Sequence, residues 1–123
     1  MESNSPERAL MEDYEYKALL YDFYGELLTD KQKEIYGLHV CEDYTAAEIA
    51  QQQGVSRQAA HDLLKRTHRL LIGYEEKLGL VEKFLDIKES VKGMLSCIEK
   101  EEMPQEERLD RLREAARRLL EII

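Results

Sequence analysis

The 123-residue sequence has no tryptophan, two cysteines, two prolines and no long apolar run. A membrane-spanning helix needs about 20 consecutive apolar residues, and no stretch approaches that length. The N-terminal segment MESNSPERALMEDYEY also lacks the basic and apolar regions of a signal peptide. We therefore expect a cytoplasmic protein, in which Cys41 and Cys97 remain free thiols.

Residues that interrupt helices are rare, because only two prolines and six glycines occur in the chain. This composition, together with a scarcity of β-branched runs, predicts an all-α fold. At this length one compact domain, or one domain with an appendage, is expected. We predict a flexible N-terminus over residues 1–12, a four-helix domain over residues 13–79, and a helical hairpin over residues 80–123 that packs or dimerises.

Patterns typical of enzymes and metal sites are missing. No glycine-rich phosphate loop occurs, and no predicted strand precedes one. His61 and His68 lie seven residues apart, whereas two metal ligands on one helix are usually four apart. His39 is expected to be packed or hydrogen-bonded. The sequence therefore predicts a protein that is not an enzyme and that holds no cofactor or metal.

The most informative stretch is residues 45–71, TAAEIAQQQGVSRQAAHDLLKRTHRLL. Thr45 and Glu48 match a capping box at the start of a short helix. Gly54 suits the left-handed conformation of a tight turn, and Ser56 can cap a second helix. The two helices are expected over residues 46–52 and 57–78.

Apolar side chains occupy the positions where these two crossed helices must touch, which completes a helix-turn-helix pattern. They are Ile49, Ala50, Val55, Ala60 and Leu63. In this motif the second helix enters the major groove, and its first turns meet the bases. The residues expected to contact nucleic acid are Ser56, Arg57, Gln58, His61, Asp62, Lys65, Arg66 and Arg69. Arg57 is suited to guanine and Gln58 to adenine.

Charge is distributed unevenly around a net value of −8. Residues 45–72 contain four basic and two acidic side chains, whereas residues 1–44 contain four basic and eleven acidic ones. Nucleic-acid affinity comes largely from neutralised phosphates, so a small basic segment orients a protein without binding strongly. Charge therefore leaves DNA, RNA and a protein open as the main partner.

Apolar spacing predicts two further helices before the motif. The first, over residues 13–28, has one apolar face, made by Tyr16, Leu19, Leu20, Phe23 and Leu27. Tyr14, Tyr21 and Tyr24 are expected at the edge of this face, with their hydroxyls in water. The second helix begins with a capping box of Thr29 and Gln32 and points Ile35, Leu38, His39 and Cys41 inward.

The C-terminal part carries two heptad seams separated by a turn around Pro104. The first seam is Leu80, Phe84, Ile87, Val91, Met94 and Ile98, and the second is Leu109, Leu112, Ala116, Leu119 and Ile123. Each seam is short, so packing on the long helix or on a second copy of the chain must complete its burial. A homodimer is the favoured arrangement.

Five segments resemble the YlxM family of small bacterial helix-turn-helix proteins. They are YDFYGELLT (Tyr21–Thr29), DYTAAEIA (Asp43–Ala50), VSRQA (Val55–Ala59), LLKRT (Leu63–Thr67) and YEEKLGL (Tyr74–Leu80). The resemblance implies a motif like region four of sigma factors. Because the family's genes lie beside those of the signal recognition particle GTPase, it also implies an accessory role in protein targeting.

Three functions remain open at this point. The first is a nucleic-acid-binding regulator. The second is an adaptor that binds the signal recognition particle GTPase or its RNA without reading DNA sequence, which suits the acidic composition. The third is a structural dimer module with a vestigial motif.

Overall fold

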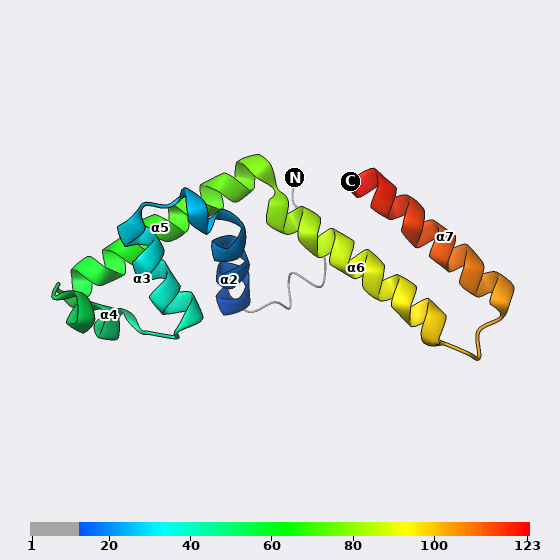
Figure 1. Cartoon of the computed structure of the whole chain (residues 1–123), viewed down its shortest axis with the longest axis horizontal. Helices are drawn as coiled ribbons and strands as arrows, with labels where there is room; N and C mark the ends of the chain where they lie inside the picture. Colours follow the sequence, from blue (N-terminus) through cyan, green and yellow to red (C-terminus); the bar gives the residue numbers. More distant parts are fainter. Residues whose placement is uncertain (1–12) are drawn as a thin grey trace. The chain divides into compact units, whose positions relative to one another are not determined.

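The structure, a computed structural model, describes residues 13–123. Within this range the chain is all-α, as predicted, and contains no strand. It divides after Val81 into two compact units, shown in Figure 1, where the labels begin at α2. The predicted flexible N-terminus, residues 1–12, lies outside the described residues. No helix within residues 13–123 has the length and apolar character needed to cross a membrane.

The first unit is built from four α-helices, and the first of them ends earlier than the predicted boundary at Leu28. They are α2 (Asp13–Tyr24), α3 (Asp30–Cys41), α4 (Ala46–Gln53) and α5 (Arg57–Leu78), with a 3-10 turn, η1 (Gly25–Leu27), after α2. Both predicted capping boxes are present, at Thr29 with Gln32 and at Thr45 with Glu48. The long helix α5 starts and ends where the sequence predicts.

The core of this unit differs from the predicted apolar face of α2. Leu20 and Tyr24 are the fully buried residues of this helix, whereas Phe23 is 38% exposed and Leu27 is 56% exposed. The prediction for both residues was wrong, and for Leu27 the reason is that α2 ends at Tyr24. The following 3-10 turn winds more tightly, so Leu27 leaves the face and Leu28 enters the core instead. Cys41, predicted to point inward, is also exposed.

Tyr24 forms a hydrogen-bonded junction where α5 gives way to α6 (Leu80–Glu99). Its hydroxyl donates to Glu75 Oε1 at 2.5 Å and accepts from the Leu80 N–H at 3.0 Å. The same Glu75 oxygen accepts from the Val81 N–H at 3.0 Å. The first N–H groups of a helix have no partner within the helix. Tyr24 and Glu75 therefore cap α6, although the sequence pattern placed the Tyr24 hydroxyl in water.

Tyr24→Phe is expected to lower the free energy of unfolding by about 1–3 kcal/mol, because the Leu80 N–H loses its partner in a part-buried place. Urea unfolding of both proteins measures this difference. Tyr74→Phe is the matched control. The Tyr74 ring packs against the Tyr24 ring, 6.0 Å between centroids, and its hydroxyl makes no hydrogen bond with the described residues. Equal effects of the two substitutions would contradict the capping role.

Stability is expected to fall at alkaline pH because of the same tyrosine. Burial, followed by the hydrogen bond with Glu75, raises the pKa of Tyr24 from 10.0 to about 12. Burial raises the pKa of Tyr36 as well. Above pH 10 the tyrosines of the unfolded chain release protons that the folded chain retains. The stability that these tyrosines contribute is therefore fully present below pH 10 and is lost as pH rises toward 12. Unfolding free energies from pH 8 to pH 11 test this, and Tyr24→Phe should flatten the decline.

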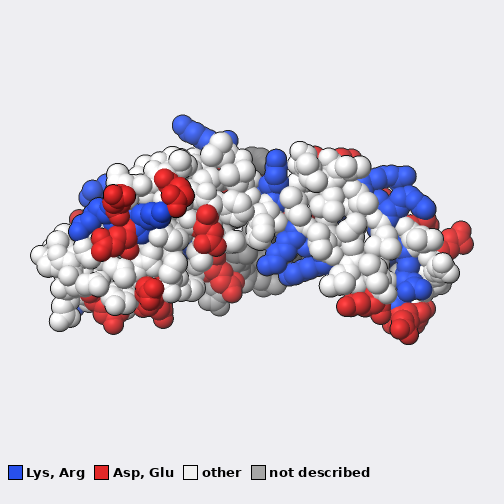
Figure 2. Space-filling view, in the orientation of Figure 1, with Lys and Arg blue, Asp and Glu red and all other residues white. Residues whose placement is uncertain are grey.

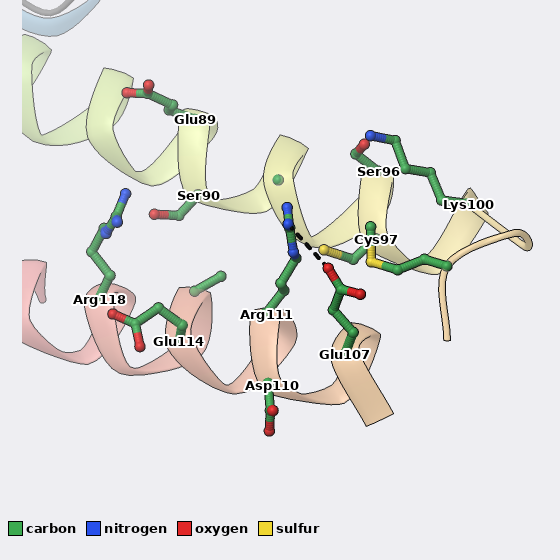
Figure 3. Close-up of a pocket in the computed structure, with 13 residues that line it drawn as sticks. Glu89, Ser90, Ser96, Cys97, Lys100, Glu107, Asp110, Arg111, Glu114 and Arg118 are labelled. Atoms are coloured by element: carbon green, nitrogen blue, oxygen red, sulfur yellow. Dashed lines mark hydrogen bonds and ion pairs between the residues drawn. The ribbon is translucent and has the colours of Figure 1, made fainter. Parts of the chain in front are cut away.

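The second unit contains the rest of α6 and the antiparallel helix α7 (Gln105–Ile122), with Pro104 at the N-cap of α7. No residue of α7 is buried. A cleft of about 460 Å³ lies between the two helices. Figure 3 shows Arg111 and Arg118 extending from α7 toward α6, and Arg111 forms an ion pair with Glu107 at 3.3 Å. Polar side chains therefore line much of the cleft between α6 and α7.

The predicted heptad seams remain largely uncovered. Among their members, Val91, Ile98, Leu109 and Ile123 are between 47% and 81% exposed. Ser90 and Cys97 are the buried residues of α6 on the side of the cleft. The hairpin thus forms without the burial that its apolar residues would supply.

Candidate nucleic-acid interface

The turn between α4 and α5 has the geometry of a helix-turn-helix. Gly54 ends α4 in the left-handed conformation with φ 70°, where a Cβ would be strained. The Val55 N–H donates to the Ala50 carbonyl at 3.0 Å, and Ser56 Oγ accepts from the Ala59 N–H at 3.0 Å. Val55 was predicted to point inward but is 44% exposed, because it lies in the turn between the left-handed glycine and the cap of α5.

The inner face of α5 packs on α3 and α4. Ile35, Ile49, Ala50 and Ala60 form one buried cluster, and Leu63 is partly buried against it. The small side chains of Ala50 and Ala60 allow the two helices of the motif to approach closely. Farther along α5, Thr67 and Leu71 continue the buried face. This packing fixes which side of α5 is presented to solvent.

All eight predicted contact residues lie on the exposed surface. Positions along a helix separated by three or four residues share a face. Gln58, Asp62, Lys65 and Arg69 follow this spacing and therefore form one outward stripe along the first half of α5. His61 and Arg66 flank this stripe, whereas Ser56 and Arg57 lie at the start of the helix.

Three of these side chains already have partners within the chain. Ser56 Oγ caps α5, and Gln58 Nε2 donates to Asp62 Oδ1 at 3.0 Å. The Gln58 amide is thus held along the helix, and Asp62 sets its orientation. Reading an adenine would require this amide to exchange its Asp62 bond for a base contact.

The four cationic side chains of the interface carry uncompensated charge. Arg57, Lys65, Arg66 and Arg69 are exposed, and none forms an ion pair with another residue in the 13–123 range. They are therefore free to meet phosphates or base edges. No group of histidine, cysteine or acidic residues suited to a metal ion occurs among the described residues.

Lys17 and His39 also approach this surface, although the sequence pattern placed neither of them in the interface. Lys17 on α2 and His39 on α3 line a groove together with His61 and Lys65 of α5. Lys17 precedes Lys65 by 48 positions, so no local spacing links the two. Only the packing of α2 and α3 against α5 brings them together.

Comparison with known proteins identifies relatives across most of the chain. The family described as "Putative helix-turn-helix protein, YlxM / p13 like" (UPF0122) matches residues 11–114. A UPF0122 protein of Caldanaerobacter subterraneus subsp. tengcongensis is 45% identical over 87 residues, covering 71% of this chain and 74% of the relative. A UPF0122 protein of Clostridium kluyveri is 44% identical over 89 residues, covering 72% of this chain and 80% of the relative.

Proposed function

Since the chain belongs to the YlxM/p13-like family of helix-turn-helix proteins, we propose that it is a nucleic-acid-binding regulatory protein. In this proposal the first turns of α5 enter the major groove of duplex DNA. Arg57 and Gln58 meet base edges, while Lys65, Arg66 and Arg69 contact phosphates. Ser56, His61 and Asp62 complete the interface.

The observation that carries this proposal is that all eight residues are exposed, with Gln58, Asp62, Lys65 and Arg69 in a stripe opposite the buried side of α5. A recognition helix must leave its outer face free while its inner face fixes its angle to the first helix of the motif. The buried cluster of Ile35, Ile49, Ala50 and Ala60 supplies that anchoring. Four exposed cations, which form no ion pair with any residue in the range 13–123, supply the attraction to phosphate.

Selection of bound sequences from random duplex DNA and from random RNA at low salt tests the proposal. We expect enrichment of a DNA motif, and an affinity that falls with salt with a logarithmic slope of about −3 to −4 if three or four phosphates are neutralised. Enrichment from RNA alone would replace DNA by RNA as the target. An absence of enrichment from both pools would overturn the proposal.

The charge of the remaining surface limits the affinity of one copy for DNA. Figure 2 shows Asp and Glu side chains gathered on the visible face of the helices of the first unit. Because the chain has a net charge of −8, one copy has little nonspecific electrostatic attraction to DNA beyond the contacts of its motif. Two copies on adjacent half-sites would double the contacts, as in other helix-turn-helix dimers.

We therefore also propose a homodimer that forms through the second unit. Phe84, Val91, Leu95 and Ile98 make an exposed apolar stripe along α6, and Leu109 and Leu120 are exposed on α7. A two-helix hairpin cannot bury both of its seams by itself, whereas two hairpins can form a four-helix bundle. The absence of any buried residue in α7 supports an additional packing partner.

Leu95→Glu combined with Ile98→Glu is expected to convert the dimer to a monomer, because two charges would be buried in the apolar contact. Light scattering after size-exclusion chromatography should give half the mass of the parent. Ser96→Glu is the matched control, since Ser96 lies on the side of α6 that faces the cleft. A parent protein that stays monomeric at the highest concentration reached on the column would refute the dimer.

A second candidate function is an adaptor for the signal recognition particle GTPase or its RNA. The acidic surface favours a basic protein surface over RNA as the partner, because an anionic protein attracts cationic groups. Titration of the chain into the purified GTPase, with and without its RNA, separates this candidate from the regulator. Binding to the GTPase that survives Arg57→Ala and Lys65→Ala would favour the adaptor.

A further inference from the structure

A groove beside the proposed interface collects the basic and imidazole side chains of separate helices. Lys17 of α2, His39 of α3, and His61, Lys65 and His68 of α5 line it, together with Tyr36, Leu64 and Ala46, and its volume is about 320 Å³. All three histidines of the chain therefore meet here. Aspartate and glutamate are absent from the described lining. Sequence patterns do not reveal this cluster, because its members come from helices far apart along the chain.

Hydrogen bonds hold two of the imidazoles in place. His39 Nδ1 lies 2.9 Å from the Tyr44 carbonyl oxygen, which only accepts, so Nδ1 carries a proton and Nε2 is the nitrogen left for a ligand. The His68 ring stacks on Tyr36 with an interplanar angle of 16°, and its Nδ1 lies 2.7 Å from the Tyr36 hydroxyl. Burial raises the pKa of Tyr36, so this hydroxyl keeps its proton. Part of the lining is thus preorganised.

Acidic residues of α3, α4 and the first half of α5 are directed elsewhere. On α5, Asp62 accepts the hydrogen bond from Gln58 at 3.0 Å. On α4, Glu48 caps its own helix by accepting from the Thr45 N–H at 2.8 Å. The acidic residues Asp30, Glu34 and Glu42 line a separate hollow with Lys33 and Cys41. Lys17 and Lys65 therefore give the groove positive charge at neutral pH, and each imidazole that takes up a proton in acid adds one more positive charge.

We propose that this groove binds a phosphate group, and that it does so more tightly in mildly acidic than in neutral solution. If the chain binds nucleic acid as proposed above, the phosphate belongs to the backbone of that nucleic acid. This assignment rests on the proposed function. His61 and Lys65 belong both to the groove and to the α5 interface. Ala46, the first residue of α4, also lines it, and the first helix of this motif crosses the sugar-phosphate backbone. The groove thus extends the interface from α5 toward α2 and α3.

Imidazole signals in NMR spectra of the full chain at pH 6.0 give the first test. Inorganic phosphate is added in one arm and a random-sequence DNA duplex in another, with chloride at matched ionic strength as the control. We expect the His39 and His61 signals to shift and saturate with both phosphate sources and not with chloride. Saturation with inorganic phosphate but not with duplex would keep the anion site and remove the DNA proposal. If the shifts in both arms match those caused by chloride, the proposal of a phosphate site in the groove is overturned.

The affinity for the same duplex at pH 7.5 and pH 5.5, measured by fluorescence anisotropy, gives the second test. We expect binding about five- to tenfold tighter at pH 5.5, since each protonated imidazole adds one charge near the phosphate. The double variant His39→Gln with His61→Gln should bind with a smaller ratio between the affinities at pH 5.5 and pH 7.5. The ratio that remains is the part due to the other titratable groups of the protein. The amide introduced at position 39 can still donate to the Tyr44 carbonyl, so folding is expected to persist. Lys77→Ala, on the same helix but outside the groove, is the control, and a ratio unchanged in the double variant would refute the proposal.

Discussion

Arg57→Ala combined with Lys65→Ala is expected to weaken binding to the selected DNA sequence by about 100-fold, the largest functional effect in this chain. Loss of a bidentate arginine–guanine contact costs about 1–3 kcal/mol, and loss of a phosphate contact by Lys65 lowers the salt slope by about 0.9. Neither side chain contributes to the core, since both are exposed and unpaired among the described residues. Circular dichroism and urea unfolding should therefore be unchanged, while fluorescence anisotropy reports the lost affinity.

The two single substitutions separate reading of sequence from binding of phosphate. Arg57→Ala should relax the preference for guanine at one position, whereas Lys65→Ala should weaken binding to all sequences alike. Lys77→Ala is the control, because Lys77 lies about 18 Å beyond Lys65 along the axis of α5 and therefore past the groove-reading turns. A double variant that binds as the parent does would exclude this face of α5 from the interface.

Ile49→Ala is expected to lower the free energy of unfolding of the first unit by about 2–5 kcal/mol, the largest stability effect that we predict. Ile49 is 0% exposed, and it packs with Ile35, Ala50 and Ala60 where α3, α4 and α5 meet. Its removal leaves a cavity at the contact that sets the angle between the two helices of the motif. Urea unfolding followed by circular dichroism measures the loss.

Val55→Ala is the comparison for this prediction. Val55 and Ile49 both fit the inward positions of a helix-turn-helix pattern, yet Val55 is 44% exposed. We expect its truncation to cost less than about 0.5 kcal/mol. If both substitutions destabilise equally, the turn is more tightly packed than the structure shows. A small effect of Ile49→Ala would instead mean that α4 contributes little to holding α5.

The two large predictions concern the outer face of α5 and the contact that α4 makes with its inner face. Ala60 and Leu71 bury one side of α5, and the outward stripe of Gln58, Lys65 and Arg69 occupies the other. Loss of the inner contacts should therefore weaken DNA binding indirectly, with unfolding detected at the same time. Loss of the outer side chains should weaken binding without unfolding, and this difference separates structural from contacting residues.

Local signals in the sequence determined the helices and their ends. The Thr29 and Thr45 boxes, the Ser56 cap and the left-handed Gly54 depend on residues within a few positions of one another. Their hydrogen bonds form inside one turn, so the sequence specifies them without reference to the rest of the chain. The sequence also specifies the all-α class and the face of α5 that carries the predicted contact residues.

Tertiary packing decided the roles that depend on distant partners. Tyr24 is a cap of α6 only because Glu75 and Leu80 lie beside it, 51 and 56 positions away. The histidine and lysine groove likewise exists only where α2, α3 and α5 converge. Apolar periodicity predicts that a helix has an inner face but does not specify how far that face is covered. For this reason Leu27, Val55 and much of the C-terminal seams are exposed although their spacing predicts burial.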